Sequence, residues 1–335
     1  MKNAVFFGDG RRIGDVYAHE TVEKLRAAYC FETDRVLSKG EMDAYRDVLA
    51  RADYLFTTWG MPHFEREEIR EYLPNLKAVY YGAGSVQYFA REFLAEGVAV
   101  FSAWAANGVP VAEYAFSEIV LASKGFFQRL HVAADGSGWP NRSLPVVFPG
   151  NYEIKVGIIG AGMIGKMVIE RLKSLDKIKI LVFDPFLPDE KAAQLGVEKT
   201  DLKTLFRECD VISNHLANNP QTVGILTGER FASMKPHAVF INTGRGAQVC
   251  EDGMIEALRA VPTRAAVLDV TFPEPPEKDS PLYTLPNVFL TPHIAGSIGN
   301  EVHRMAEYMF EESVSFDAGL PTRYRVTEKM LETMA

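Results

Sequence analysis

The stretch of sequence that decides the fold is Val156-Gly-Ile-Ile-Gly-Ala-Gly-Met-Ile-Gly165. An apolar strand runs directly into three glycines with the spacing Gly-x-Gly-x-x-Gly, and a helical segment follows. Gly160 permits the tight turn, Gly162 lets the backbone approach a pyrophosphate, and Gly165 lets the helix pack against the strand. The stretch therefore predicts a βαβ unit that binds a dinucleotide.

The residues that follow this glycine loop support the same prediction. Met163 and Ile164 begin the predicted helix, where free backbone amides and the positive end of the helix dipole favour phosphate groups. A second predicted strand, residues 178–183, ends at Asp184, where a carboxylate can accept hydrogen bonds from the ribose hydroxyls of NAD. The charge of Asp184 would repel a 2′-phosphate and no arginine adjoins it, so NAD is favoured over NADP.

Working outward from the loop, predicted strands and helices alternate along the chain. This alternation indicates βαβ units and mostly parallel sheets, and the length favours two domains, so we predict two Rossmann-like, doubly wound α/β domains. A Gly- and Pro-rich stretch at 134–151 interrupts the alternation and is predicted to be a long loop or arm. Strands are expected at 4–7, 54–58, 78–81, 98–101, 156–159, 178–183, 211–213, 239–242, 265–270 and 288–290, and helices at 20–29, 163–175, 202–208 and 252–260.

Composition and charge exclude several classes of partner. The net charge of −8 gives no electrostatic reason to bind nucleic acid or an anionic membrane. The most apolar long stretch, residues 111–130, carries three charged side chains, which argues against a membrane span. The three cysteines lie far apart without the spacing of metal ligands, so we expect a cytoplasmic protein with no metal and no disulfide framework.

Three polar residues follow predicted strands of the second half of the chain: Arg245, Glu274 and His293. In open α/β sheets, ligands bind at the carboxyl ends of the strands, so these side chains are expected at one edge. A guanidinium can hold a carboxylate and a neighbouring oxygen through its planar fork. A carboxylate beside an imidazole stabilises the imidazolium and fixes its orientation, and His293 can then exchange a proton with a substrate oxygen.

Taken together, these motifs resemble the D-isomer-specific 2-hydroxyacid dehydrogenases. The resemblance implies an NAD-dependent oxidoreductase that moves a hydride to or from C2 of a small 2-hydroxy or 2-keto acid. In such a family Arg245 would bind the substrate, His293 would be the proton donor or acceptor, Glu274 would pair with His293, and Asp269 would contact the nicotinamide. The resemblance rests on Gly82–Gly84, Asn107–Glu113, Gly160–Gly165, Met234–Pro236, Ile241–Gly246, Leu268–Pro275 and Thr291–Gly296.

The same resemblance implies the domain organisation and an assembly. Residues 1–116 and 298–335 would form a discontinuous substrate-binding domain, and residues 117–297 would form the NAD-binding domain. Long helices starting near Pro110 and Ile298 would cross between the two. A homodimer is implied, built through the cofactor domain and the arm at 134–151.

Further binding residues are expected around the two sites. His215, after the predicted strand 211–213, and Thr243 are candidate cofactor contacts. Backbone amides of Ala83 and Gly84 would hold the substrate carboxylate, as the family implies. Trp59, in an unusual Thr-Trp-Gly-Met-Pro sequence, could stand at the pocket mouth.

The chain departs from the family pattern in places, and two other functions stay open. Met163 and Gln248 stand where the family usually has a polar and an aliphatic residue, and Val86 and Gln87 stand where Asp-Asn is common. Formate dehydrogenase is similar overall but pairs its histidine with glutamine, which Glu274 argues against. An NAD(H)-sensing binding protein on the same scaffold can retain all three polar residues, and turnover of a 2-keto acid would discriminate.

Overall fold

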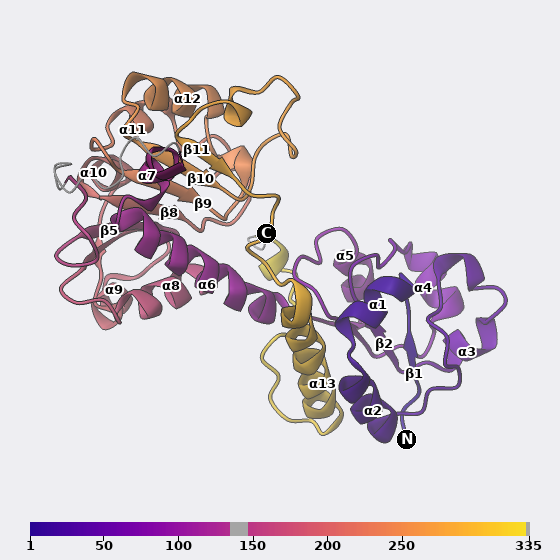
Figure 1. Cartoon of the computed structure of the whole chain (residues 1–335). Coiled ribbons are helices and arrows are strands. Elements are labelled where there is room, and N and C mark those ends of the chain that lie inside the picture. Colours follow the sequence, from indigo (N-terminus) through magenta and orange to yellow (C-terminus); the bar gives the residue numbers. More distant parts are fainter. Residues whose placement is uncertain (135–146, 333–335) are drawn as a thin grey trace. The chain divides into compact units, whose positions relative to one another are not determined.

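A computed structural model of the chain describes residues 1–134 and 147–332 (Figure 1). The chain divides into two compact units. The terminal unit comprises Met1–Gly108 and Ser297–Ala335, and the central unit comprises Val109–Gly296. Each unit contains one parallel sheet with helices on both faces, so the predicted α/β fold class is confirmed. Most of the predicted arm at 134–151 lies outside the described residues.

The sheet of the terminal unit has the strand order β1-β2-β3-β4, and all its pairings are parallel. Every residue of these strands is buried, as expected for a parallel sheet covered on both faces. On its other side, β1 forms single bridges from Asn3 to Cys30 and from Phe7 to Leu37. The strands are β1 (Ala4–Phe6), β2 (Tyr54–Thr57), β3 (Ala78–Tyr81) and β4 (Ala99–Ser102).

Alternate side chains of these strands enter two separate apolar clusters. One face packs Val5, Leu55 and Val79 against α3, α4 and α5, and the opposite face packs against α1, α2 and α13. On that opposite face the rings of Phe56, Tyr80 and Phe101 stack in sequence, each centroid 5.0 Å from the next. The helices are α1 (Gly10–Val16), α2 (His19–Ala28), α3 (Arg46–Arg51), α4 (Arg66–Tyr72), α5 (Ala90–Ala95) and α13 (His303–Asp317).

The seven-stranded sheet of the central unit has the order β11-β10-β9-β8-β5-β6-β7, and all its pairings are parallel. The strand order reverses between β5 and β8, which is the topological switch point where α/β sheets bind ligands. The strands are β5 (Lys155–Ile159), β6 (Lys179–Phe183), β7 (Glu198–Lys199), β8 (Val211–Asn214), β9 (Val239–Asn242), β10 (Ala265–Leu268) and β11 (Val288–Leu290).

Helices cover both faces of this sheet as well. The cluster on one face includes residues of α6, α7, α8 and α9, and the cluster on the other includes residues of α10 and α12 and Phe231 of α11. The helices are α6 (Trp104–Ser123), α7 (Phe126–Ala134), α8 (Met163–Leu172), α9 (Asp189–Leu195), α10 (Leu202–Glu208), α11 (Gly228–Ala232) and α12 (Glu251–Ala260). Short 3-10 helices occur at Lys39–Glu41, Gly246–Gln248, Pro281–Tyr283, Gly299–Val302 and Met330–Glu332.

Several predicted boundaries are wrong. Helix α6 begins at Trp104, before the expected start near Pro110, and Pro110 lies inside it. The apolar stretch 111–130 is broken between α6 and α7, where Gly125 adopts a φ of 67° that β-carbon-bearing residues avoid. A 3-10 turn precedes α13, which begins at His303 and not near Ile298. Among the described residues, no helix is both long and apolar enough to cross a membrane.

Candidate active site

The glycine loop at the end of β5 packs closely against the protein at Gly160 and Gly165 and faces open space at Gly162. Gly160 has a φ of 90°, and a Cβ there would stand 2.8 Å from the carbonyl oxygen of His215. A Cβ on Gly165 would overlap the carbonyl oxygen of Gly160, so α8 can approach the loop only through a glycine. A Cβ on Gly162 would meet no atom within 4 Å. The backbone is therefore closed on the protein side and open on the side where a pyrophosphate would bind.

Asp184, directly after β6, is tied to this loop. One carboxylate oxygen accepts a hydrogen bond from the amide of Ala161 at 2.7 Å, and the other accepts one from the amide of Phe186 at 2.8 Å. The side chain stays partly exposed, so it retains acceptor capacity for a ligand. Its contact with a ribose remains a prediction.

His215 and Thr243 meet beyond the ends of β8 and β9. The Nε2 atom of His215 lies 2.9 Å from Oγ of Ser213, and its Nδ1 atom lies 3.5 Å from Oγ1 of Thr243. Desolvation by burial lowers the pKa of His215 to about 4, so its imidazole is neutral at neutral pH. Because the His215 carbonyl also adjoins Gly160, both candidate cofactor residues lie at the switch point of the sheet.

Arg245 follows β9 and is held by a buried amide network. The side chain of Gln248, which is fully buried, accepts hydrogen bonds from Asn214 Nδ2 at 2.7 Å and from the Arg245 amide at 3.3 Å. Asn242 accepts from Asn214 Nδ2 at 2.9 Å and from the Gly244 amide at 3.0 Å. The network fixes the loop that carries Arg245. Sequence reasoning noted Gln248 only as a departure from the family, because nothing local indicates that it is buried.

The Arg245 guanidinium itself keeps most of its donors free. Its Nη1 atom donates to the carbonyl of Gly244 at 2.7 Å, and we find no other hydrogen-bond acceptor for the guanidinium in the described part of the chain. Burial lowers the pKa of Arg245, while the Glu274 carboxylate favours the charged form. A Cβ on Gly246 would overlap the backbone of Thr271, so the loops after β9 and β10 are in contact. A desolvated guanidinium with unused donors suits the binding of an anion.

His293 and Glu274 form a direct contact. The Nδ1 atom of His293 lies 2.7 Å from Oε1 of Glu274, and about half of each side chain is exposed. The backbone of His293 has a φ of 54°, a left-handed conformation that costs free energy in a residue other than glycine. Its amide donates to the carbonyls of Asp269 and Thr291, at 3.1 and 3.0 Å, which holds this conformation in place.

Asp269, buried after β10, anchors the same loop. Its carboxylate accepts from the amides of Ile294 at 2.8 Å and Ala295 at 2.9 Å, and from Oγ1 of Thr291 at 2.6 Å. These three bonds position the loop that carries His293. The family resemblance implied a nicotinamide contact for Asp269, which stays a prediction, but did not indicate this anchoring role.

The predicted substrate residues Ala83, Gly84 and Trp59 belong to the terminal unit. The amide of Ala83 donates to the carbonyl of Tyr81 at 2.8 Å, whereas the amide of Gly84 has no partner among residues 1–134 and 147–332. Of these two amides, only that of Gly84 is therefore available to a carboxylate. Trp59 is partly buried and lines a cavity of this unit.

No metal centre is found in the parts of the chain that the structure describes. Groups of three or more His, Cys, Asp or Glu side chains that could hold an ion are absent there. The described cysteines are all unpaired.

Comparison with known proteins gives matches in sequence and in fold. Residues 119–295 match the family described as D-isomer specific 2-hydroxyacid dehydrogenase, NAD binding domain. A D-3-phosphoglycerate dehydrogenase of Archaeoglobus fulgidus is 33% identical over 236 residues, which cover 70% of this chain but 44% of that protein. A putative 2-hydroxyacid dehydrogenase of Bacillus subtilis, YoaD, is 34% identical over 206 residues, 60% of this chain and 58% of that protein. The matched region thus spans about half the length of these curated relatives.

Solved structures share the fold of the whole chain at lower identity. A phosphoglycerate oxidoreductase from Rhizobium etli has a TM-score of 0.82 at 22% identity, covering 99% of this chain and 100% of that one. The NAD complex of a D-isomer specific 2-hydroxyacid dehydrogenase from Lactobacillus delbrueckii has a TM-score of 0.76 at 19% identity, covering 97% and 100%. At these identities the likeness concerns the fold alone.

Proposed function

The chain belongs to the family of D-isomer-specific 2-hydroxyacid dehydrogenases, and from this premise we propose that it is an NAD-dependent enzyme that transfers a hydride between NAD(H) and C2 of a small 2-hydroxy or 2-keto acid. In this proposal the central unit binds the cofactor and the terminal unit contributes the loop at Gly84 to substrate binding.

The contact between His293 and Glu274 carries the proposal. Its 2.7 Å distance joins Glu274 to Nδ1, so the Nε2 atom of His293 is the one left to face a substrate. With Nδ1 donating to the carboxylate, Nε2 can give a proton to the keto oxygen during reduction and take it back during oxidation. The carboxylate of Glu274 holds the ring so that Nε2 is the atom that gives up this proton.

Arg245 is assigned to the substrate carboxylate and the C2 oxygen. The buried side-chain amides of Asn214, Asn242 and Gln248 fix the loop that carries Arg245. The guanidinium is desolvated, and most of its N–H donors have no acceptor within the described protein. A positive charge beside the C2 oxygen also stabilises the negative charge that develops there as the carbonyl is reduced.

The residues of the central unit fit NAD. The open space before Gly162 suits a pyrophosphate at the N-terminus of α8, and Asp184 suits the ribose hydroxyls while disfavouring a 2′-phosphate. Asp269, His215 and Thr243 are proposed to line the remainder of the cofactor site. When bound, the nicotinamide supplies or accepts the hydride.

The location and assembly of the protein are also proposals. Three unpaired cysteines in a chain of 335 residues favour a reducing compartment, and we propose the cytoplasm. Family membership favours a homodimer, which light scattering of the purified protein would test.

Two substitutions separate substrate binding from proton transfer. We expect His293→Ala to lower kcat by a factor on the order of 10²–10⁴ with KM little changed, because the general acid is lost.

Arg245→Ala should lower kcat and raise KM for the keto acid, because the guanidinium contacts the substrate in the ground state and the transition state. Steady-state kinetics of NADH oxidation would check both, and full activity of His293→Ala would rule out this role for the histidine.

A further inference from the structure

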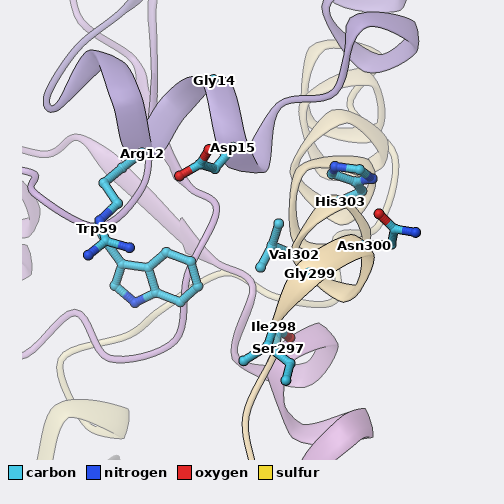
Figure 2. Close-up of a pocket in the computed structure, with 10 residues that line it drawn as sticks. All are labelled: Arg12, Gly14, Asp15, Trp59, Ser297, Ile298, Gly299, Asn300, Val302 and His303. Atoms are coloured by element: carbon cyan, nitrogen blue, oxygen red, sulfur yellow. The ribbon is translucent and has the colours of Figure 1, made fainter. Parts of the chain in front are cut away.

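The terminal unit contains a cavity of about 770 Å³ lined by polar and aromatic side chains (Figure 2). It collects residues from three places in the sequence: α1, the loop after β2, and the segment that leads into α13. Its polar and aromatic lining residues are Arg12, Asp15, Trp59, Ser297, Asn300 and His303.

Neighbours of two residues that line this cavity contact the loop assigned above to the substrate carboxylate. Thr58, next to Trp59, donates from Oγ1 to the carbonyl of Gly82 at 2.7 Å. Asn107 accepts from the amide of Ser297 at 3.0 Å, and its Nδ2 atom would lie 3.6 Å from a Cβ built on Gly84. The lining residues Trp59 and Ser297 are thus linked to the glycine turn at 82–84 through Thr58 and Asn107, within the terminal unit.

The polar side chains of the cavity are not used by the protein itself. In the described part of the chain, none of its six polar and aromatic residues makes a side-chain hydrogen bond or an ion pair, and the hydroxyl of Ser297 is buried without a partner. Arg12 and Asp15 lie one helical turn apart on α1 and still do not pair.

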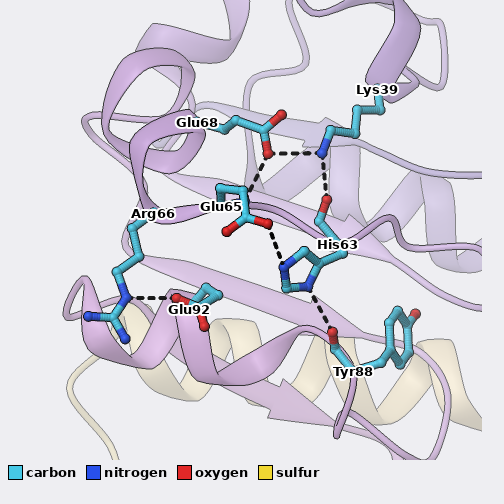
Figure 3. Close-up of polar contacts among 7 residues, drawn as sticks. All are labelled: Lys39, His63, Glu65, Arg66, Glu68, Tyr88 and Glu92. Atoms are coloured by element: carbon cyan, nitrogen blue, oxygen red, sulfur yellow. Dashed lines mark hydrogen bonds and ion pairs between the residues drawn. The ribbon is translucent and has the colours of Figure 1, made fainter.

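Charged side chains elsewhere in this unit behave differently. Around α4, Lys39 pairs with Glu68 at 2.8 Å and Arg66 pairs with Glu92 at 2.7 Å (Figure 3). Arg12 and Asp15, which are both exposed, differ in this from the paired charges around α4. Other arginines of the unit that form ion pairs are Arg26, Arg35, Arg46, Arg51 and Arg70.

The chemistry of the lining selects one kind of ligand. A guanidinium and a carboxylate on the same wall offset each other, so a phosphate dianion near Arg12 would also meet the negative charge of Asp15. Hydroxyl groups, which both donate and accept, can satisfy both side chains together with Asn300. The flat face of Trp59 suits the apolar C–H edge of a carbon chain. The cavity of about 770 Å³ is far larger than the hydrogen atom or methyl group that the smallest 2-keto acids carry on C2.

We propose that this cavity binds the hydroxylated carbon chain of a sugar-derived 2-hydroxy or 2-keto acid, with Arg12 and Asp15 hydrogen-bonded to its hydroxyls and Trp59 packed against the chain. The proposal rests on the proposed dehydrogenase function and names its substrate class. Arg12, Asp15 and Trp59 are then specificity-determining residues remote from the reacting carbon.

Kinetics with three acids would test this assignment. NADH-dependent reduction of 2-keto-D-gluconate, glyoxylate and 3-phosphohydroxypyruvate would be measured for the wild type, Arg12→Met and Asp15→Ala. The matched control is Arg11→Met, which alters the neighbouring exposed arginine outside the cavity. We expect the wild type to prefer 2-keto-D-gluconate to glyoxylate about tenfold in kcat/KM, because only the longer acid carries hydroxyls that can form charge-assisted hydrogen bonds with Arg12 and Asp15.

Both cavity variants should lower kcat/KM for 2-keto-D-gluconate about tenfold or more, mainly through KM, and leave glyoxylate within about twofold. Arg11→Met should change neither. Reduction of glyoxylate without preference for 2-keto-D-gluconate would overturn the cavity assignment and leave the dehydrogenase function intact. Preference for the phosphorylated acid, lost in Arg12→Met, would also overturn it. Failure to reduce any of the three acids would count against the dehydrogenase function itself.

Discussion

Glu274 acts on His293 through one short contact that water partly screens. Because 48% of the His293 side chain and 42% of the Glu274 side chain are exposed, the pair adds little to the stability of the fold. Its importance lies in holding Nδ1 at 2.7 Å, which orients the ring and places a negative charge beside the imidazolium. The contact should therefore affect catalysis more than folding.

The substitution Glu274→Gln tests whether the contact affects catalysis more than folding. The amide keeps a hydrogen-bond acceptor but removes the charge beside the imidazole, so kcat for reduction should fall at least tenfold while the free energy of unfolding stays within about 0.5 kcal/mol of wild type. The measurements are kcat for reduction of the keto acid and a urea titration. Wild-type kcat in Glu274→Gln would remove the coupling between the two side chains from the mechanism.

Glu118, on α6, is a buried acid that no motif indicated. Only 7% of the residue is exposed and Oε2 has no partner in the described part of the chain. Desolvation raises the pKa of Glu118 to about 8, although a hydrogen bond with Tyr114 opposes the shift. The sequence placed Glu118 in an apolar stretch but could not show that its carboxyl group points into the core.

The pKa of Glu118 predicts how stability depends on pH. Between its ordinary value of 4.5 and about 8, the unfolded chain is ionised at this residue while the folded protein keeps the proton. The free energy of unfolding should therefore fall as pH rises through this window, by at most about 5 kcal/mol. Glu118→Gln should remove this dependence and be more stable than wild type at pH 8 in urea titrations. Parallel pH curves for the two proteins would show that Glu118 ionises freely.

At the scale of elements, two glycines where the loop meets α8 have different roles: one concerns packing and the other concerns space for a ligand. Gly165 is needed for packing, since any side chain would overlap the Gly160 carbonyl. Gly162 has a φ of −66°, which other residues adopt, and a Cβ there points into open space. The fold therefore does not require glycine here, and we propose that the approach of a ligand does.

Alanine at each position should separate these requirements. Gly165→Ala should lower the free energy of unfolding by about 1–3 kcal/mol or more, because the helix must shift away from the strand. Gly162→Ala should change it by less than about 1 kcal/mol but raise the Kd for NADH at least tenfold, since the methyl group enters the space assigned to the pyrophosphate. Urea titration and NADH fluorescence would measure the two effects. Wild-type NADH affinity in Gly162→Ala would place the pyrophosphate elsewhere.

Most strands could be predicted because each is a short apolar run between helical segments. The elements that were not predicted include β7, which has two exposed residues, and α1, whose start lies within a turn sequence capped by Asp9. The sequence pattern did not indicate the break between α6 and α7, because Gly125 in an apolar stretch is weak evidence for one. Elements without a hydrophobic period of their own are stabilised by their neighbours, which a local pattern does not report.

At the scale of the whole molecule, the chain leaves the terminal unit after Gly108 and returns to it at Ser297. The returning segment joins the first sheet: the amide of Val326 donates to the carbonyl of Val100 at 2.8 Å. The alternation of predicted strands and helices did not indicate a discontinuous domain, and only the resemblance to a family led to one. The sequence could predict that the polar side chains after the strands lie at one edge of the sheet. Parallel strands bring their carboxyl ends together at that edge.

The cavity of the terminal unit could not be foreseen in the same way. Trp59 was singled out as an unusual residue, but Arg12, Asn300 and His303 belong to no motif, and Arg12 lies far from the other two in the sequence. Their proximity depends on how α1 and the segment before α13 pack on the sheet. Specificity therefore depends on long-range packing, while the reaction class depends on local motifs.

The most direct test of the proposed dehydrogenase function is NADH oxidation by the purified protein. Loss of reduced-nicotinamide absorbance would be followed with glyoxylate, hydroxypyruvate, pyruvate, phenylpyruvate and 2-keto-D-gluconate, with NADPH in parallel. We predict turnover of at least one acid, faster with NADH than with NADPH. Tight binding of NADH without turnover of any 2-keto acid would contradict the proposed function and favour an NAD(H)-sensing protein on the same scaffold.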